Sequence, residues 1–260
     1  MAVEKEQEDI IRFEGVKKAF GAGCVLDGVD FTVHRGETFA LVGPSGTGKS
    51  VTLKHMVRLL TPDDGNVFVG DVIVNQSSGH ALEKVRDRFG YLFQGGALLA
   101  WMSVAENIAL PLLEKTQLTQ AEIDHRVAEV LDMVGMARDG DKRPSEISGG
   151  MKKRAGLARA IVTNPDIVLY DEPTSGLDPV TSRTIDSLID RLREETQITS
   201  VVVTHDLHSA LAIAHRIAVL QDGKIIEIST PAEFVESRNE QVVRFLESQY
   251  ITKRGAWEDA

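Results

Sequence analysis

Several features are scarce in this 260-residue chain, and each scarcity excludes a class of protein. Cys24 is the only cysteine, so neither a disulfide framework nor a thiolate metal cluster can form within one chain, which fits a reducing compartment. Basic side chains are in deficit, because 29 Lys and Arg stand against 39 Asp and Glu and give a formal net charge of -10. Binding nucleic acid phosphates needs the opposite excess, so we expect no nucleic-acid partner.

Long apolar runs are missing as well. No stretch approaches the roughly 18 apolar residues of a membrane span. Residues 1–9 carry Glu4, Glu6, Glu8 and Asp9 instead of the basic start and apolar core of a signal peptide. We therefore expect that any action at a membrane depends on a second chain that supplies the membrane part.

One segment that is present indicates a nucleotide site. Residues 43–50 fit the phosphate-loop pattern G-x-x-x-x-G-K-[ST] and follow an apolar run at 39–42; they read Gly43-Pro44-Ser45-Gly46-Thr47-Gly48-Lys49-Ser50, with Val51 next in the helical stretch. The glycines let backbone N–H groups curl around phosphates, and the following helix points its positive end at them. We expect Lys49 to contact the β- and γ-phosphates and Ser50 to offer its hydroxyl to Mg2+. A glycine-rich turn of no function is the alternative.

Two further patterns are typical of nucleotide hydrolysis. Residues 167–170 form a short apolar strand that ends in Asp171 and Glu172, where an α/β sheet keeps its ligand site. We expect Asp171 to hold Mg2+ and Glu172 to orient or deprotonate the attacking water, unless the two only close a strand. Upstream, Ser148-Gly149-Gly150 predicts a helix N-cap and anion-binding nest.

The order of patterns along the chain predicts an α/β fold. Strands at 10–16, 29–34 and 66–74 indicate an antiparallel layer, 98–163 is helical, and 167–170 and 200–204 are typical of central parallel strands. Asp222-Gly223 predicts a hairpin turn. The sequence thus divides into the first part of a catalytic core at 1–94, a helical subdomain at 95–163, the second part of the core at 164–238 and a helical tail at 239–260, with a frayed end at 253–260.

Taken in order, the motifs resemble those of an ATP-binding-cassette ATPase. Three of these motifs are the phosphate loop, Ser148-Gly149-Gly150 and the strand that ends in Asp171-Glu172. The others are Gln94 after 91–93, Asp178 at the end of 175–178, and His205 in 204–206. The resemblance covers residues 10–230 and implies a P-loop NTPase (RecA-like) core with an antiparallel β layer and an inserted helical subdomain. It implies ATP and Mg2+ as cofactors and ATP hydrolysis as the activity.

The resemblance also implies roles for single residues. Phe20 would stack on adenine, Gln94 would link the nucleotide and its metal ion to a membrane partner, and His205 would reach the γ-phosphate. Ser148, Gly149 and Gly150 would contact the γ-phosphate held by a second copy, and Asp178 would line the dimer seam. Four of these residues have a simpler alternative. Phe20 could be a core residue, Gln94 a surface amide, and Asp178 an N-cap. His205 could be a strand-end histidine whose hydrogen bonds are satisfied.

The expected partners follow from the same likeness. The sequence offers no evident arginine finger in cis, so a second copy could close the open side of the triphosphate with its Ser148-Gly149-Gly150 helix start. We expect an ATP-sandwich homodimer bound to transmembrane permease subunits, hence peripheral at the cytoplasmic face of the inner membrane. A cassette that works away from membranes is an alternative, although the two-cassette chains of translation factors and the long insertions of repair proteins are absent.

Shorter stretches resemble the Mla-type ATPases that power phospholipid movement between bacterial membranes. They are Met151, where most cassettes carry Gln, and residues 92–98 and 107–112. A lipid-binding periplasmic subunit is a further partner that this interpretation allows, and an amino acid, metal or other small-solute importer is the alternative. The tail places Val242, Phe245, Leu246 and Tyr250 on one helical face, which could pack on a neighbouring subunit or on its own domain.

Overall fold

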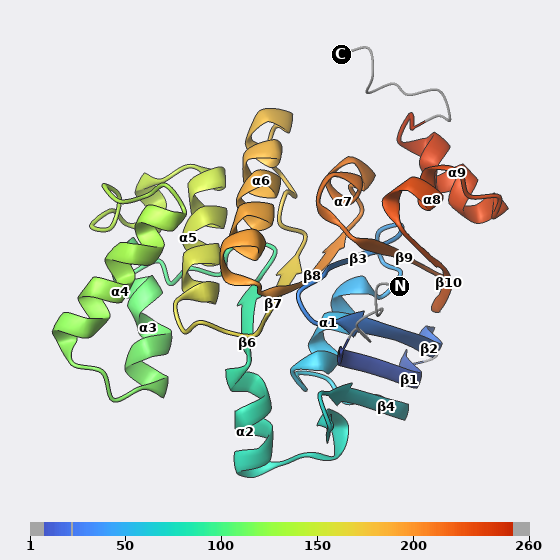
Figure 1. Cartoon of the computed structure of the whole chain (residues 1–260), viewed down its shortest axis with the longest axis horizontal. Coiled ribbons are helices and arrows are strands. Elements are labelled where there is room, and N and C mark those ends of the chain that lie inside the picture. The colour runs from blue at the N-terminus through green and yellow to red at the C-terminus, as the bar shows by residue number, and fades with distance from the viewer. Residues whose placement is uncertain (1–7, 22, 252–260) are drawn as a thin grey trace, which may run out of the picture. The chain divides into compact units, whose positions relative to one another are not determined.

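The computed structural model describes residues 8–21 and 23–251, which form two units (Figure 1). Unit 1 is Met1–Arg86 with Val201–Ala260, and unit 2 is Asp87–Ser200. The expected frayed end at 253–260 lies outside the described residues.

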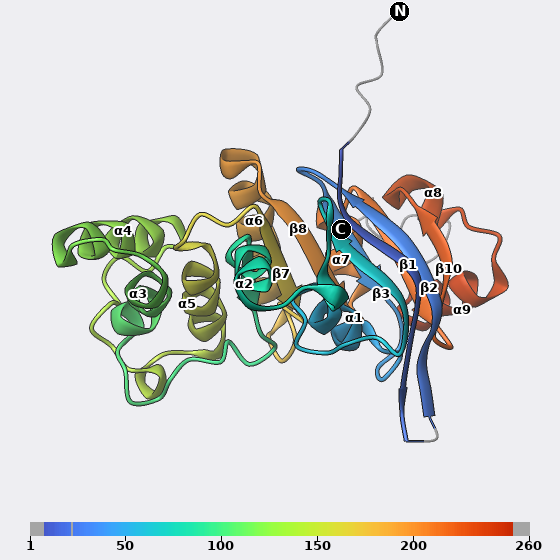
Figure 2. The same ribbon diagram turned by 90° about the horizontal axis from the view of Figure 1, so that it is seen from below.

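An antiparallel sheet of four strands opens unit 1, as the sequence predicts, in the order β2-β1-β4-β5. Its strands are β1 (Asp9–Phe20), β2 (Gly23–His34), β4 (Asp64–Val69) and β5 (Val72–Ile73). β1 and β2 lie side by side in Figures 1 and 2, and β4 lies beside β1 in Figure 1. β1 and β2 run well beyond the expected 10–16 and 29–34 and form a long hairpin. A stack of Phe13, Phe31 and Phe39 packs beneath the sheet.

The expectation of one strand at 66–74 is wrong. Gly70 takes a φ of 56, a left-handed conformation that turns the chain between β4 and β5. After β5 the chain forms a 3-10 turn, η1 (Val74–Gln76), which leads to α2 (Gly79–Asp87). Sequence alternation carried no signal for this turn, because Val72, Ile73 and Val74 continue the apolar pattern.

A second group of strands in unit 1 has the order β10-β9-β3-β8. These strands are β3 (Thr38–Val42), β8 (Thr199–Thr204), β9 (Arg216–Gln221) and β10 (Lys224–Ser229). β3 pairs parallel with β9, and both β3 and β8 are buried along their whole length. The predicted hairpin turn is confirmed, because Asp222 and Gly223 both take positive φ between β9 and β10.

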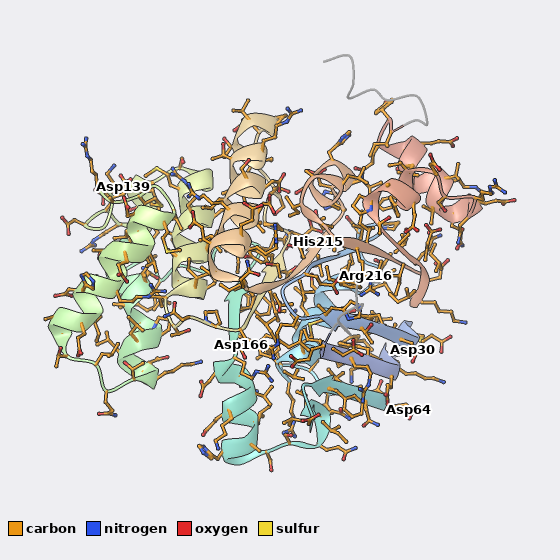
Figure 3. All side chains as sticks on the ribbon, viewed as in Figure 1. Asp30, Asp64, Asp139, Asp166, His215 and Arg216 are labelled. Carbon is orange, nitrogen blue, oxygen red and sulfur yellow. The ribbon has the colours of Figure 1, made fainter. Side chains whose placement is uncertain are left out.

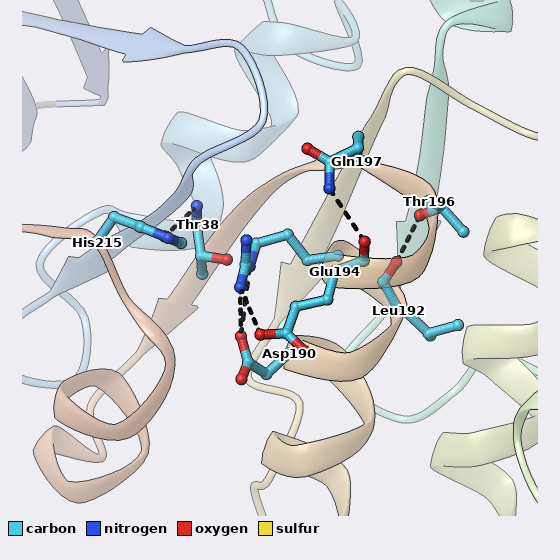
Figure 4. A network of polar contacts seen from close by, with 8 residues as sticks. Thr38, Asp190, Leu192, Glu194, Thr196, Gln197 and His215 are labelled. Carbon is cyan, nitrogen blue, oxygen red and sulfur yellow. Dashed lines mark hydrogen bonds and ion pairs between the residues drawn. The ribbon is translucent and has the colours of Figure 1, made fainter.

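Polar contacts fasten β9 to the start of β3. His215 Nδ1 accepts a hydrogen bond of 3.0 Å from the Thr38 N–H (Figure 4). The neighbouring Arg216 guanidinium lies 3.2 Å from Glu37 and 5.5 Å from the centre of the Phe39 ring, and both His215 and Arg216 are labelled in Figure 3. Paired polar groups therefore hold the start of the buried strand β3 to β9.

The tail of the chain packs on its own unit. The last helices are α7 (Leu207–Ile213), α8 (Pro231–Val235) and α9 (Glu240–Ser248). Val242, Phe245 and Leu246 are buried in one cluster with residues of β3, β9 and α7, so these three side chains pack on their own unit, the simpler of the two placements expected for them. Tyr250, expected on the same face, is 87% exposed.

Unit 2 contains the strand pair β6 (Phe89–Leu92) and β7 (Ile167–Asp171), which run parallel. A helical group, green to yellow in Figure 1, comprises α3 (Val104–Lys115), α4 (Gln120–Met133), the 3-10 turn η2 (Pro144–Glu146) and α5 (Gly149–Ile161). A capping box of Thr119 and Glu122 forms the start of α4. An Arg88–Asp166 ion pair of 2.8 Å ties the beginnings of the two strands.

Helix α6 (Pro179–Thr196) follows β7 and is closed at both ends by side chains. Asp178 is its N-cap, as predicted. At the other end, the Thr196 hydroxyl donates to Leu192 O, and the Gln197 amide donates to Glu194 O at 3.0 Å (Figure 4). These side chains satisfy carbonyls that a helix end leaves without backbone partners.

A buried histidine gives unit 1 a pH-sensitive element. His55, in α1 (Lys49–Met56), places Nδ1 2.7 Å from Val51 O, and its Nε2 is buried with no hydrogen-bond partner in the described part of the chain. Because the carbonyl can only accept, Nδ1 carries the proton of the neutral ring. Burial lowers the pKa of His55, the Val51 carbonyl opposes that shift, and the charges of Lys18 and Asp63 act in opposite directions.

The free energy of unfolding should therefore fall on acidification. With a folded pKa below the unfolded value of about 6.5, the unfolded chain binds more protons in the window below pH 6.5, and stability drops by at most about 1.4 kcal/mol per pH unit there. Urea unfolding from pH 7.5 to 5 should show a steeper fall for the unmodified chain than for His55→Leu, which does not titrate. Parallel curves would contradict the assignment.

Candidate functional site

The phosphate loop joins β3 to α1, and its glycines are favoured by the backbone conformation and, at two positions, by close packing. Gly43, Gly46 and Gly48 all take positive φ. A Cβ on Gly43 would lie 2.3 Å from Leu220 O, and one on Gly48 would lie 2.9 Å from Val25 Cγ1. Only glycine fits at these two positions, so the loop adopts its tight curve because of the strands packed behind it.

Lys49 lies at the centre of this loop. Its buried Nζ donates to Gly43 O at 2.8 Å and to Pro44 O at 2.9 Å. Helix α1 begins there with no acidic residue in its first turn and no side-chain cap on its N-terminal N–H groups. Backbone donors, a helix N-terminus and a buried ammonium group thus converge on one loop, an arrangement that suits an anion with several phosphates.

Two other predicted residues lie in unit 1. Phe20 ends β1 with 49% of its surface exposed, so it is not a core residue, and Lys18 Nζ lies 5.6 Å from its ring centre. His205 directly follows β8, which is buried along its whole length, and is itself exposed. An exposed ring at a strand end is available for stacking or for contact with a ligand.

Two carboxylates lie at the end of β7 in unit 2, as predicted: Asp171 is its last residue and Glu172 follows it. Asp171 and Glu172 are 6% and 8% exposed. Tyr91 donates from its hydroxyl to Asp171 Oδ2 at 3.4 Å, and burial together with the charge of Asp171 raises the pKa of Tyr91 above its usual range. Glu172 takes a φ of 51, a left-handed conformation that costs a residue other than glycine about 1–2 kcal/mol. Such strain is typical of functional positions.

Lys153 of α5 holds this strained turn, and sequence analysis did not single it out. Its buried Nζ donates to Glu172 O at 2.7 Å, to Ser175 Oγ at 3.3 Å and to Gln94 O. Burial lowers the pKa of Lys153, while the carboxylates of Glu172 and Asp171 oppose the shift. A signal was present, since Lys153 shares the helical spacing of the buried residues Gly150, Leu157, Ala160 and Ile161.

The loop after β6 is fixed to the same helix. Arg159 of α5 donates to Ala97 O at 2.7 Å and to Gly96 O at 2.8 Å. Gln94 itself is exposed, while its backbone carbonyl is held by Lys153. The Gln94 side chain is therefore presented on an immobilised backbone.

The start of α5 matches the predicted helix cap. Ser148 Oγ accepts from Met151 N at 3.3 Å. Gly150 is packed so tightly that a Cβ would lie 2.5 Å from Thr181 Cγ2, whereas a Cβ on Gly149 would make an ordinary contact of 3.5 Å with Leu177. Gly150 is thus required by packing within the chain, and the exposed Gly149 is not.

Asp178 is the N-cap of α6, the simpler of the two roles expected for it. Its Oδ1 accepts from Val180 N and Thr181 N, each at 3.0 Å, and its Oδ2 accepts from the Thr181 hydroxyl. The hydroxyl and backbone bonds of Thr181 keep the pKa of Asp178 below its usual value. No cluster of three or more metal-binding His, Cys, Asp or Glu side chains occurs within the described ranges.

Comparison with known proteins adds independent findings. The family model described as ABC transporter matches residues 26–175. The chain is 40% identical over 250 residues to the "Probable ribonucleotide transport ATP-binding protein mkl" of Mycobacterium tuberculosis, which covers 96% of this chain and 69% of the relative. It is 36% identical to the intermembrane phospholipid transport system ATP-binding protein MlaF of Haemophilus influenzae, over 93% and 92% of the two chains.

A solved structure is similar in fold. It is a dimeric ATP-binding cassette in a post-hydrolysis state bound to ADP and Pi, with a TM-score of 0.78 and 33% identity over 85% of this chain and 98% of the other. The predicted fold class, a P-loop core with an antiparallel β layer, is therefore confirmed.

Replacing Lys153 by Met should destabilise unit 2. Met fills a similar volume but donates nothing, so Gln94 O and Glu172 O each lose the Lys153 hydrogen bond, while Glu172 O keeps its donors from Ser175, and the loss costs about 1–3 kcal/mol. Lys152→Met is the matched control, because the neighbouring side chain is partly exposed, and it should change the free energy of unfolding by less than about 0.5 kcal/mol. Equal effects of the two variants in urea unfolding would show that the buried contacts of Lys153 do not stabilise the fold.

Proposed function

The chain belongs to the ABC transporter family of ATP-binding proteins and is an ATPase, and from that premise we propose that it drives a membrane permease by closing around ATP as a homodimer. The observation that carries the proposal is the phosphate loop, where backbone donors, the uncapped start of α1 and the buried Lys49 ammonium converge.

The roles of the two units differ in this proposal. The loop of residues 43–50 and Val51 bind the triphosphate, with Lys49 at the β- and γ-phosphates. Glu172 orients or deprotonates the attacking water, and the strained turn fixed by Lys153 sets the direction of its side chain. Phe20 is exposed and so can stack on adenine, and His205 reaches the γ-phosphate from the end of β8.

The donor set also fits Mg2+. The Ser50 hydroxyl, the Asp171 carboxylate and the Gln94 amide oxygen are the hard oxygen ligands that this ion prefers, usually with only one or two carboxylates beside water and phosphate. When bound, the ion would neutralise charge that develops on the phosphates.

A second copy completes the site. Its Ser148, Gly149 and Gly150 offer the N-terminus of α5 to the γ-phosphate, where Gly149 is exposed and has no packing reason within its own chain to be glycine. Asp178, besides capping α6, would line the seam between the copies. The similar solved cassette is itself a dimer.

The membrane partner would bind unit 2. None of the helices in the described residues has the length and apolar character needed to cross a bilayer. Unit 2 exposes large apolar side chains that suit a protein interface; they are Phe93, Trp101, Leu113, Leu118 and Val180. Trp101 is 72% exposed, and Phe93 adjoins Gln94. This surface would place the chain at the cytoplasmic face of the inner membrane through its permease.

The transported substrate we favour is phospholipid. Met151 and residues 92–98 resemble Mla-type ATPases, and the relative from Haemophilus influenzae is named for phospholipid transport. The mycobacterial relative is named for ribonucleotide transport, and that name favours a second candidate, the ATPase of a small-solute transporter. A lipid-binding periplasmic subunit belongs to the first proposal only.

The Glu172→Gln chain should bind ATP and form a dimer with Mg-ATP, but not with ADP, because it keeps the phosphate contacts and loses the group that acts on water. Its hydrolysis rate should fall by about 10²–10⁴-fold. Sedimentation and phosphate release measure the two effects. Lys49→Ala, in contrast, should lose ATP binding itself.

Adding Gly149→Asp to Glu172→Gln should abolish the dimer while ATP binding persists, since a carboxylate would then face the γ-phosphate. The contact of a Cβ at this position is an ordinary 3.5 Å, so the fold should survive. A double variant that still dimerises with Mg-ATP would show that the α5 start does not contact the second nucleotide.

For the substrate, ATP hydrolysis by the assembled complex should rise with phospholipid in the surrounding membrane and should not respond to water-soluble solutes. The same complex with Glu172→Gln gives the background rate. A native complex that contains a periplasmic solute-binding protein and no bound lipid would exclude the phospholipid proposal and favour the small-solute transporter.

A further inference from the structure

The end of the last helix holds the loop that carries His205. Gln249 is the C-cap of α9, and its side-chain amide faces the connection between β8 and α7. Its Oε1 accepts from Leu207 N at 2.9 Å, and its Nε2 donates to His205 O at 2.5 Å. The Gln249 carbonyl lies 3.3 Å from Nε2 of His208. Three contacts therefore join two segments more than 40 residues apart.

Gln249 is itself rigidly placed. Its backbone N–H donates to Leu246 O at 3.1 Å, and Ile251 N donates to the same carbonyl at 3.1 Å. Leu246 and Ile251 are buried in the cluster beneath α7 and β3. The main chain on both sides of Gln249 is thus anchored in the core, and the amide is presented from a fixed base.

The loop that Gln249 contacts is short, and hydrogen bonds at its two ends also hold it. Thr204 Oγ1 accepts from Asp206 N at 3.0 Å, and Asp206 caps α7 by accepting from Ser209 N at 3.2 Å. Between these contacts, the carbonyl of His205 and the N–H of Leu207 both receive their partner from the one amide of Gln249. The backbone of His205 is therefore fixed from β8, from α7 and from α9.

We propose that Gln249 is a positioning residue for ATP hydrolysis: it fixes the backbone from which His205 reaches the γ-phosphate. The inference rests on the role proposed above for His205. The tail helix then contributes to turnover within its own chain. α9 buries its apolar face in the core, and the side-chain amide of its C-cap residue, Gln249, binds the loop. When a positioned side chain is displaced by about 1 Å, the rate of the reaction can fall by as much as 10²-fold.

The test compares variants of Gln249 in the whole 260-residue chain, assembled with its membrane subunits if turnover requires them. Gln249→Met removes the donor and the acceptor at similar volume, whereas Gln249→Glu keeps an acceptor for Leu207 N and removes the donor to His205 O. We expect kcat to fall about 10- to 100-fold for Met and less for Glu. The Kd for ATP should stay within about twofold, because the phosphate loop is untouched.

Gln197 supplies the matched control. It is also a C-cap glutamine whose amide donates to a backbone carbonyl, that of Glu194, at the exposed end of α6 (Figure 4). Gln197→Met and Gln197→Glu make the same chemical changes and should leave kcat and Kd unaltered. A charge effect or a general loss of a helix cap would appear in both pairs of variants.

His205→Ala separates the failure of this inference from that of the proposed function. If His205→Ala turns over normally, the proposed role of His205 is wrong and the inference falls with it. If His205→Ala is impaired while Gln249→Met keeps its kcat, only the positioning role is wrong. A Gln249→Met chain whose ATP affinity and melting temperature fall in step with kcat would likewise overturn it, in favour of a purely structural contact.

Discussion

The arrangement of this protein depends on one constraint: charged and strained groups must be held at the ends of strands that are themselves fully buried. β3 leads into the phosphate loop, β7 ends at Asp171 and Glu172, and β8 ends before His205. Apolar strands of this kind cannot shift without exposing their side chains, so they give the loops a rigid base. The functional residues lie on loops, and the buried strands fix the positions of these loops.

Each of these loops is then fixed by a contact that comes from elsewhere in its unit. The phosphate loop curves against Leu220, the Glu172 turn is held by Lys153, and the His205 loop is held by Gln249. The contacts of Lys153 and Gln249 are hydrogen bonds to backbone carbonyls, whereas Leu220 limits the space beside Gly43. The two side chains thus give irregular backbone a hydrogen-bond donor that regular secondary structure would otherwise supply. Positioning and stability therefore use the same interactions.

Local patterns were enough to predict much of this structure. The glycines of the phosphate loop, the caps at Ser148 and Asp178 and the turn at Asp222 each follow from short-range chemistry, and the structure has them where expected. The turn at Gly70 was missed because apolar residues continue past it. Helical spacing indicates that Lys153 is buried, but the partners of Lys153 and Gln249 could not be predicted, since they lie 19 and 44 residues away and are set by tertiary packing. The tail helix was assigned two possible surfaces, and only packing could decide between them.

The central claim is that one ATP is enclosed by two copies of this chain. The most direct measurement is a structure of the Glu172→Gln chain with Mg-ATP. We predict that the γ-phosphate lies within about 3 Å of Lys49 Nζ in one protomer and of the backbone N–H of the partner subunit's Gly149. An ATP molecule held by one protomer alone, with the N-terminus of α5 of the other copy facing solvent, would contradict the account.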